Sequence, residues 1–205
     1  MPRTARFIQD NGYYHVISRS INQTHIFRDP EDFSRFRKLQ QQAKRDFPLR
    51  LFHYVIMHTH FHFVLQATTQ HALSAHLAQL KWRYTIWMRR KYGWKGPLWR
   101  ERYKSLPIES EEYLTACGTY VEFNPIRAGL CKEPAAYPHS SYRHYHLGVP
   151  DELLDPYLPP ALPPSLSAID YSSETARFIF SAATAIGGPA YLFQRRPAKN
   201  ACPQK

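Results

Sequence analysis

Three histidines at alternating positions are the residues of this sequence best suited to chemistry. His58, His60 and His62 lie in residues 57–65, a stretch that begins polar and ends apolar. Strand side chains point to opposite faces in turn, so the three imidazoles would share one face. Two neutral imidazoles two positions apart can bind one divalent metal ion. A half-buried strand that carries histidines without a metal explains the triplet equally well.

A tyrosine and an asparagine form a second group with chemical potential. Tyr120 and Asn124 are four positions apart in a predicted helix, which places both side chains on one helical face. The amide oxygen of Asn124 would suit Mg²⁺ or Mn²⁺ beside two imidazoles. Tyr120 would then lie one turn away, and its oxygen needs an activated target such as a metal-polarised phosphodiester. Taken singly, a core tyrosine and a helix-capping asparagine are the simpler interpretations.

The composition favours one globular domain with a polyanionic partner. The 205 residues are 43% hydrophobic and 21% charged, and this length allows a substantial core. The formal net charge of +11 indicates an anionic partner such as nucleic acid. Aromatic residues reach 15%, and tyrosine with arginine is typical of surfaces that stack bases and neutralise phosphates.

The cysteines and the N-terminus predict where the protein resides. Cys117, Cys131 and Cys202 are far apart and form no CxxC pair, which argues against a zinc ribbon and favours a reducing compartment. No long apolar run follows the basic N-terminus, so we expect neither a signal peptide nor a transmembrane helix. The sequence therefore predicts a cytoplasmic protein with no membrane partner.

The elements that must position these residues alternate between strand and helix. Runs of aromatic and β-branched residues predict strands over residues 13–19, 50–57, 60–66 and 98–108. Apolar residues at helical spacing, with capping residues before them, predict helices over residues 31–46, 70–92 and 110–123. The order strand, helix, strand, strand, helix, strand predicts an α+β fold, a ferredoxin-like antiparallel sheet with helices on one face.

The composition changes near the C-terminal end. Residues 150–164 hold six prolines, which predicts a stiff, extended linker. Residues 174–186 are a candidate for one further short helix. We therefore expect a domain over residues 1–148, followed by a Pro-rich linker and tail over residues 149–205.

Several stretches of the chain resemble a known family. His60-Phe61-His62 resembles the His-hydrophobic-His motif of the HUH endonucleases. More closely, the chain resembles the single-tyrosine transposases of the REP-associated type, relatives of the transposases of small single-strand insertion sequences. The matching stretches occur in family order at residues 12–19, 26–29, 57–65, 97–103, 120–130 and 137–142. A lone HxH is a weak signal, whereas the ordered set with Tyr-x-x-x-Asn-Pro-x-Arg-Ala-Gly is specific.

The resemblance implies a mechanism and a partner. It implies that His60, His62 and Asn124 bind Mg²⁺ or Mn²⁺ and that Tyr120 attacks DNA. The family cuts single-stranded DNA beside a hairpin, leaving a phosphotyrosine link to the 5′ end and a free 3′-hydroxyl. A second strand end can then attack and reseal without ATP. The expected partner is single-stranded DNA with REP-like hairpins, bound by a monomer or a homodimer.

Basic residues and two departures from the family pattern complete the predicted site. The candidate DNA contacts are Arg19, Arg100, Arg102, Lys104 and Arg127.

Where the family usually has Pro-Asn, this chain has His58-Thr59, so His58 could add a ligand, a phosphate contact or nothing. Where the family often has glycine, this chain has Ser20, which removes no catalytic group.

Other protein classes share some of these features. A DNA- or RNA-binding module without catalysis would use the same charge and aromatics. A phosphoesterase would need paired His-x-Thr/Ser motifs, and only His139-Ser140-Ser141 fits one well. Replication initiators and conjugative relaxases would share the histidine pair but usually need more domains. Since all the chemical residues are present, the sequence favours an active enzyme.

Overall fold

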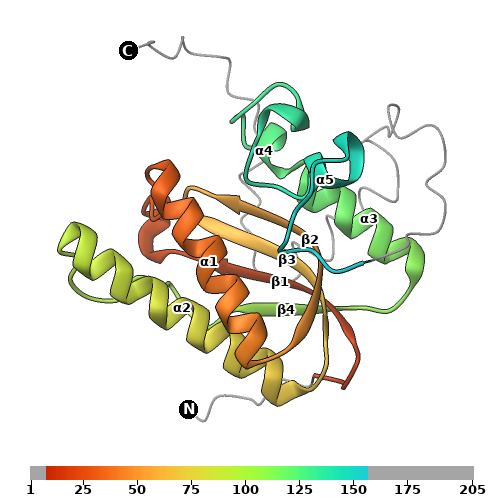
Figure 1. Ribbon diagram of the computed structural model, residues 1–205, viewed down its shortest axis with the longest axis horizontal. Helices are drawn as coiled ribbons and strands as arrows, with labels where there is room; N and C mark the ends of the chain where they lie inside the picture. The colour runs from red at the N-terminus through yellow and green to blue at the C-terminus, as the bar shows by residue number, and fades with distance from the viewer. Residues whose placement is uncertain (1–7, 157–205) are drawn as a thin grey trace. The chain divides into compact units, whose positions relative to one another are not determined.

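A four-stranded antiparallel sheet lies at the centre of the computed structural model, which describes residues 8–156 (Figure 1). The strands are β1 (Tyr13–Arg19), β2 (Leu49–Met57), β3 (His60–Ala67) and β4 (Lys104–Ile108). The α-helices are α1 (Pro30–Asp46), α2 (Gln70–Tyr92), α3 (Glu111–Glu122), α4 (Asn124–Arg127) and α5 (Tyr142–Leu147). Two short 3₁₀ helices are η1 (Ile21–Gln23) and η2 (Pro134–Ala136).

The predicted ferredoxin-like arrangement is confirmed. The strand order is β2-β3-β1-β4, and each neighbouring pair is antiparallel. The two crossover helices, α1 and α2, lie together on one face of the sheet, as the order of elements requires (Figure 1). Helix α3, which follows this core, packs on the opposite face. The sheet is therefore covered on both sides.

The main core lies between the sheet and helices α1 and α2. Strand β3 contributes Phe61 and Phe63, which alternate with residues of the opposite face. Phe36 of α1 packs against Phe61 with ring centroids 5.2 Å apart, and against Tyr84 of α2 at 5.1 Å. Burial of each such ring contributes roughly 1.5–3 kcal/mol to folding. These contacts fix β3 and its register in the sheet.

The helices begin and end where the capping residues predict. Asp29 and Ser110 each accept a hydrogen bond from the backbone N–H three residues later, and Thr69 caps α2 in the same way. Pro30 occupies the first position of α1, and Gly93 ends α2 with φ of 62°. No helix in the described part of the chain is long and apolar enough to cross a membrane.

The predicted fourth strand is wrong in its first half. Strand β4 begins only at Lys104, and the residues before it follow an irregular path. Trp99 makes a single bridge to Ser20, and its indole N–H donates to the Lys81 carbonyl at 3.1 Å. Tyr103 is buried in the main core. Ile17 pairs with Lys104 and Ser20 bridges Trp99, so residues 100–103 lie opposite only Ser18 and Arg19 and cannot follow β1 as a regular strand.

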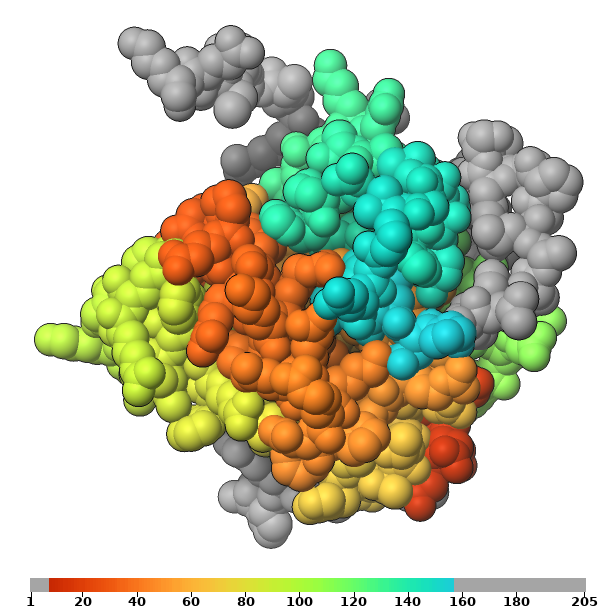
Figure 2. Space-filling model, viewed as in Figure 1, coloured from red at the N-terminus to blue at the C-terminus, as the bar shows by residue number. Residues whose placement is uncertain are grey.

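Residues 149–156 pack against the domain rather than leaving it. Leu153 is 1% exposed and belongs to the main core. The Asp151 carboxylate pairs with Arg37 of α1 at 2.8 Å, and Asp155 accepts from the Leu51 N–H at 2.7 Å. On the surface this segment, in cyan, lies beside α1, in orange (Figure 2). The boundary at residue 148 stays a prediction, and the rest of the predicted linker and the predicted helix 174–186 lie outside the described residues.

Candidate active site

Strand β3 holds His60 and His62 on the face that lies away from the main core. His62 pairs with Ile17 of β1 and Val55 of β2, so it lies between two strands. His60 begins the strand and pairs with Arg19, the last residue of β1. The two imidazole rings lie with centroids 5.0 Å apart. Strand alternation thus brings both imidazoles to one face.

His58 does not share this face, because it lies in the turn between β2 and β3. Its Nδ1 donates to the Phe27 carbonyl at 2.8 Å. Its ring stacks on that of His25, with centroids 5.3 Å apart. The expectation that three histidines share one face is therefore wrong for His58, and its accessory role stays a prediction.

A fourth histidine, His15 of β1, joins the pair on β3. Its Nε2 lies 2.9 Å from Nδ1 of His62, within hydrogen-bond distance, and both rings are buried. His15 was not among the residues predicted from the sequence. The sequence signal for His15 is its position between the large apolar residues Tyr14 and Val16 in a predicted strand, and both of these neighbours belong to the main core. Alternation along β1 therefore turns His15 to the side of His62.

Burial keeps these imidazoles neutral. Loss of solvation lowers the pKa of His15 to about 4. It also lowers the pKa of His60 to about 4, and the positive charge of Arg19 acts in the same direction. Burial, with the neighbouring histidines, holds the pKa of His62 well below its ordinary value. A neutral imidazole keeps the lone pair that a metal ion needs.

Helix α3 brings Tyr120 to the buried histidines. The Tyr120 ring meets His62 edge-on with centroids 6.2 Å apart, and meets His15 in the same way at 5.9 Å. The Arg127 guanidinium of α4 lies 4.5 Å from the centroid of the Tyr120 ring. Four side chains from β1, β3, α3 and α4 therefore meet at one place.

Asn124 opens α4 directly after a break in the helix at Phe123. Its amide Nδ2 donates to the Tyr120 carbonyl at 3.1 Å. This bond ties the beginning of α4 to the last turn of α3, as a simple capping residue would. It uses only the nitrogen of the amide, so Oδ1 remains an acceptor that suits a hard cation.

The donor atoms of the site fit a divalent ion. Nδ1 of His60 lies 2.8 Å from the Thr59 hydroxyl, and Nδ1 of His62 faces His15, so each ring keeps Nε2 for a ligand. Within residues 8–156, no three His, Cys, Asp or Glu side chains are gathered to hold a metal ion. Two imidazoles and the amide oxygen of Asn124 stay the predicted ligand set, which water or substrate oxygens would complete.

The predicted basic contacts come from several different elements of the fold. Arg100 and Arg102 are exposed in the irregular segment before β4, and Lys104 lies within the strand. The Arg100 N–H donates to the Arg19 carbonyl at 3.0 Å. This bond brings Arg100 to the end of β1, where Arg19 pairs with His60. Two of the predicted basic residues thus lie at the histidine end of the sheet.

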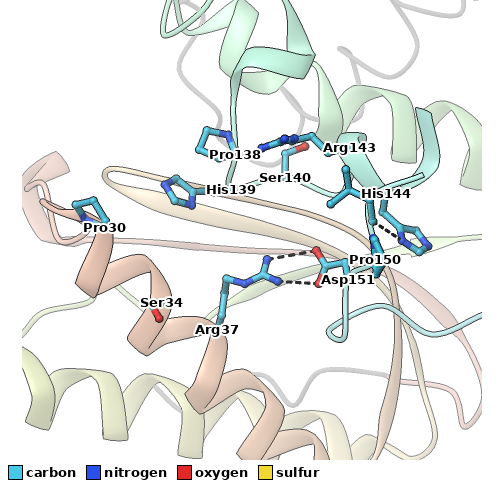
Figure 3. A pocket seen from close by; sticks show the side chains of 11 residues that line it. Pro30, Ser34, Arg37, Pro138, His139, Ser140, Arg143, His144, Pro150 and Asp151 are labelled. Carbon is cyan, nitrogen blue, oxygen red and sulfur yellow. Dashed lines mark hydrogen bonds and ion pairs between the residues drawn. The ribbon is translucent and has the colours of Figure 1, made fainter. Parts of the chain in front are cut away.

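A pocket of about 270 Å³ lies elsewhere, between α1 and residues 138–151 (Figure 3). Arg37 points across it toward Asp151, and the two form an ion pair. His139, from the phosphoesterase-like motif, lines the pocket and stacks on Phe33 with centroids 3.6 Å apart. None of the predicted metal, tyrosine or DNA-contact residues lines this pocket.

Comparisons with known proteins identify relatives of the chain. Residues 8–124, more than half of the 205, match the family described as "Transposase IS200 like". A REP-associated tyrosine transposase, solved bound to a REP hairpin, is similar with a TM-score of 0.62 and 17% identity, over 79% of this chain and 99% of that chain. A candidate transposase from Deinococcus radiodurans has a TM-score of 0.41 and 20% identity, over 60% of this chain and 96% of that chain. No curated protein matches the chain significantly.

Proposed function

Since this chain belongs to the IS200-like transposase family, we propose that it is a metal-dependent enzyme that cleaves and rejoins single-stranded DNA beside hairpins. The observation that carries the proposal is the position of the Tyr120 ring, 6.2 Å from that of His62. A nucleophile and buried neutral imidazoles are the parts that such a transesterification needs. The similar protein solved with a REP hairpin supports REP-like palindromes as the substrate class.

The metal would be held by His60, His62 and Asn124. A bound Mg²⁺ or Mn²⁺ would polarise the scissile phosphodiester and orient it. His15 supports this arrangement, because its Nε2 can accept the Nδ1 proton of His62 and so leave Nε2 of His62 for the ion. Metal-binding histidines commonly have such an orienting partner at the second nitrogen.

Tyr120 would carry out the chemical step. Its hydroxyl oxygen attacks phosphorus and gives up its proton, the bond from phosphorus to the 3′-oxygen breaks, and the 3′-oxygen takes up a proton and leaves as a hydroxyl. The 5′ side of the DNA stays on the enzyme as a phosphotyrosine. The 3′-hydroxyl of a second strand end can attack that phosphorus and release Tyr120. Arg127, beside the tyrosine ring, would neutralise charge on the attacked phosphate.

The geometry supports attack by Tyr120 at the metal site of its own chain. His15, His62 and Tyr120 lie within ring contact of one another in a single copy. Of the two predicted states, monomer and homodimer, the monomer would therefore be competent for cleavage. The cytoplasmic location stays a prediction.

A hairpin-binding DNA or RNA protein without catalysis is the second candidate. Exposed Arg100 and Arg102, which lie outside any regular element, would serve binding alone equally well. The two functions differ in one product. Only the enzyme forms a covalent bond to DNA.

The test is an adduct assay with a labelled single-stranded hairpin oligonucleotide and Mg²⁺ or Mn²⁺. The wild type should form a 5′-phosphotyrosine adduct that peptide mass spectrometry maps to Tyr120. Tyr120→Phe should bind the hairpin and form no adduct, because only the nucleophilic oxygen is lost and the ring still packs.

Tyr113→Phe is the matched control on the same helix and should keep the adduct. Tyr113 lies seven residues away, roughly 10 Å along the axis, whereas in-line attack needs about 3–3.5 Å between the reacting atoms. An adduct in Tyr120→Phe, or one mapped to another residue in the wild type, would contradict the assignment. Cleavage without any adduct would identify a nuclease that uses water.

A further inference from the structure

A buried carboxylate lies in the last turn of α3, between Tyr120 and Asn124 in the sequence. Glu122 is 2% exposed. The Ser141 hydroxyl donates to its Oε1 at 2.8 Å, and Nδ1 of His53 lies 2.9 Å from the same oxygen. Its Oε2 lies 3.1 Å from Nε2 of His146. Glu122 thus joins the end of α3 to β2 and to both the start and the body of α5.

The contacts of this carboxylate are directional, because its two oxygens accept hydrogen bonds from Ser141, His53 and His146. A buried carboxylate with several hydrogen-bond donors has little freedom to move, because each lost bond leaves a charged oxygen unsatisfied. Nothing in the proposed chemistry uses Glu122 directly.

The contact with His53 depends on a glycine one turn earlier in α3. A Cβ atom at Gly118 would lie 2.6 Å from Nε2 of His53, closer than real contacts allow. Glycine in a helix interior is unfavourable relative to alanine, so the small residue here carries a cost in helix stability. Because Gly118 has no side chain, the His53 ring fits between β2 and α3 and reaches Glu122.

His53 connects this network to the strand that carries the histidines. In the register of β2 and β3, His53 pairs with Val64 and Val55 pairs with His62. The carboxylate of Glu122 is therefore bonded to a residue only two positions from the partner of His62. A shift of α3 relative to β3 would break this bond.

The apolar contacts of α3 do not define its position in the same way. Leu114, Cys117 and Val121 pack on the sheet with other buried residues of this face. Apolar burial is non-directional, so it tolerates small sliding or rotation of the helix. In-line attack does not tolerate such displacement.

We propose that Glu122 is a positioning residue for the transesterification, which holds the end of α3 so that Tyr120 and Asn124 meet the histidines of β3. The inference rests on the proposed function, because it takes Tyr120 as the nucleophile. Glu122 acts through the helix and does not touch the reacting atoms.

The first experiment compares three variants of the full chain. Glu122→Ala should bind a labelled hairpin as the wild type does but form the Tyr120 adduct about 10²-fold more slowly, as expected for a displacement of about 1 Å. Glu122→Gln keeps an oxygen for Ser141 and His53 and an NH₂ group for His146, and should react within about tenfold of the wild type. Glu112→Ala, which removes an exposed carboxylate from the other end of α3, should react at the wild-type rate.

The second experiment changes the contact between His53 and α3 through Gly118 instead of Glu122. Gly118→Ala should slow adduct formation with unchanged hairpin affinity, because its Cβ meets the His53 ring. His53→Ala removes that ring. The double variant Gly118→Ala/His53→Ala should therefore react no more slowly than His53→Ala alone, a non-additive result that marks direct coupling.

Single-turnover rates, hairpin affinity and circular dichroism melting are measured on each variant, at a temperature where all are folded. A wild-type rate in Glu122→Ala would overturn the inference. So would equal losses of rate in Glu122→Gln and Glu122→Ala, or a fall in rate that only follows a fall in hairpin affinity. Failure of the proposed function looks different, because the wild type itself would then form no adduct at Tyr120.

Discussion

The two faces of the sheet are filled by different kinds of side chain. The face covered by α1 and α2 holds fully buried aromatic rings, among them Phe27, Phe36, Phe61, Phe63 and Tyr84. The face covered by α3 has a smaller apolar cluster and several buried polar groups, among them His15, His53, His62 and Glu122. Because apolar burial is the main driving force of folding and the second face has the smaller apolar cluster, we expect that face to contribute less to stability. One face therefore holds the fold together, and the other carries the residues of the proposed chemistry.

Strand β3 belongs to both faces, because its residues alternate between them. Phe61 and Phe63 pack into the main core, while His62 between them faces Tyr120. A shift of one residue in register would exchange the two sets of side chains. Aromatic packing on one face therefore fixes the register that presents the histidines on the other.

His62→Ala and Phe63→Ala test this separation most directly, because they change neighbouring residues on opposite faces. His62→Ala should abolish adduct formation and leave hairpin affinity nearly intact, since phosphate contacts supply most of that affinity. Phe63→Ala should lower the free energy of unfolding by about 3–5 kcal/mol, because it leaves a cavity in the main core.

The adduct assay and urea unfolding are carried out on both variants. Equal losses of stability in His62→Ala and Phe63→Ala would mean that the two faces do not differ in their contribution to folding. Wild-type cleavage by His62→Ala in Mg²⁺ would remove this histidine from the proposed metal site.

Much of the fold could be predicted because its signals are local. Helix α2 was predicted over residues 70–92 and observed as Gln70–Tyr92, since periodicity and a terminal glycine define both ends. The prediction was wrong before β4, where contacts of Trp99 with Ser20 and with α2 override the alternation of the sequence. Such contacts join distant residues and have no local pattern.

The candidate site was less accessible from sequence for the same reason. His60, His62, Tyr120 and Asn124 were found through their spacing and through the family resemblance. His15 and Glu122 act through bonds to residues 47 and 69 positions away, and no spacing rule predicts such partners. Alternation grouped His58 with His60 and His62 on one face, although the two predicted strands, 50–57 and 60–66, already leave residue 58 in the turn between them.

Two truncations test whether residues 149–156, which follow α5, stabilise the main core. Truncation after Gly148 removes Leu153, which is buried in the main core, and Asp151, which pairs with Arg37. We expect it to lower the free energy of unfolding by about 3 kcal/mol, mostly from the lost apolar burial and little from the ion pair.

Truncation after Pro156 is the matched control. It keeps every contact of the segment within residues 8–156, including the bond from Arg50 to the Pro156 carbonyl. Its urea unfolding midpoint should be higher than that of the protein truncated after Gly148. If the two truncated proteins unfold at the same urea concentration, the packing of residues 149–156 does not contribute to stability.

A buried histidine on the apolar face allows a finer comparison. His76 of α2 is fully buried, and its Nδ1 donates to the Phe47 carbonyl at 3.1 Å. Burial lowers its pKa from 6.5 to about 4. As the pH falls, the unfolded chain therefore takes up a proton before the folded protein does. The stability that neutral His76 permits is present above about pH 6.5 and is lost progressively toward pH 4.

Replacing this histidine should change the pH dependence of stability and leave the chemistry alone. For a single group with this shift, linkage predicts a loss of about 2 kcal/mol between pH 7 and pH 5. His76→Gln should remove this pH-dependent contribution. The free energy of unfolding of the variant should therefore fall less steeply with decreasing pH than that of the wild type. Urea unfolding at pH 7, 6 and 5 measures the slope, and the adduct assay at pH 7 should give the wild-type rate. Parallel slopes would show that burial on the apolar face does not keep His76 neutral, and a slower adduct would show that this face contributes to the chemistry.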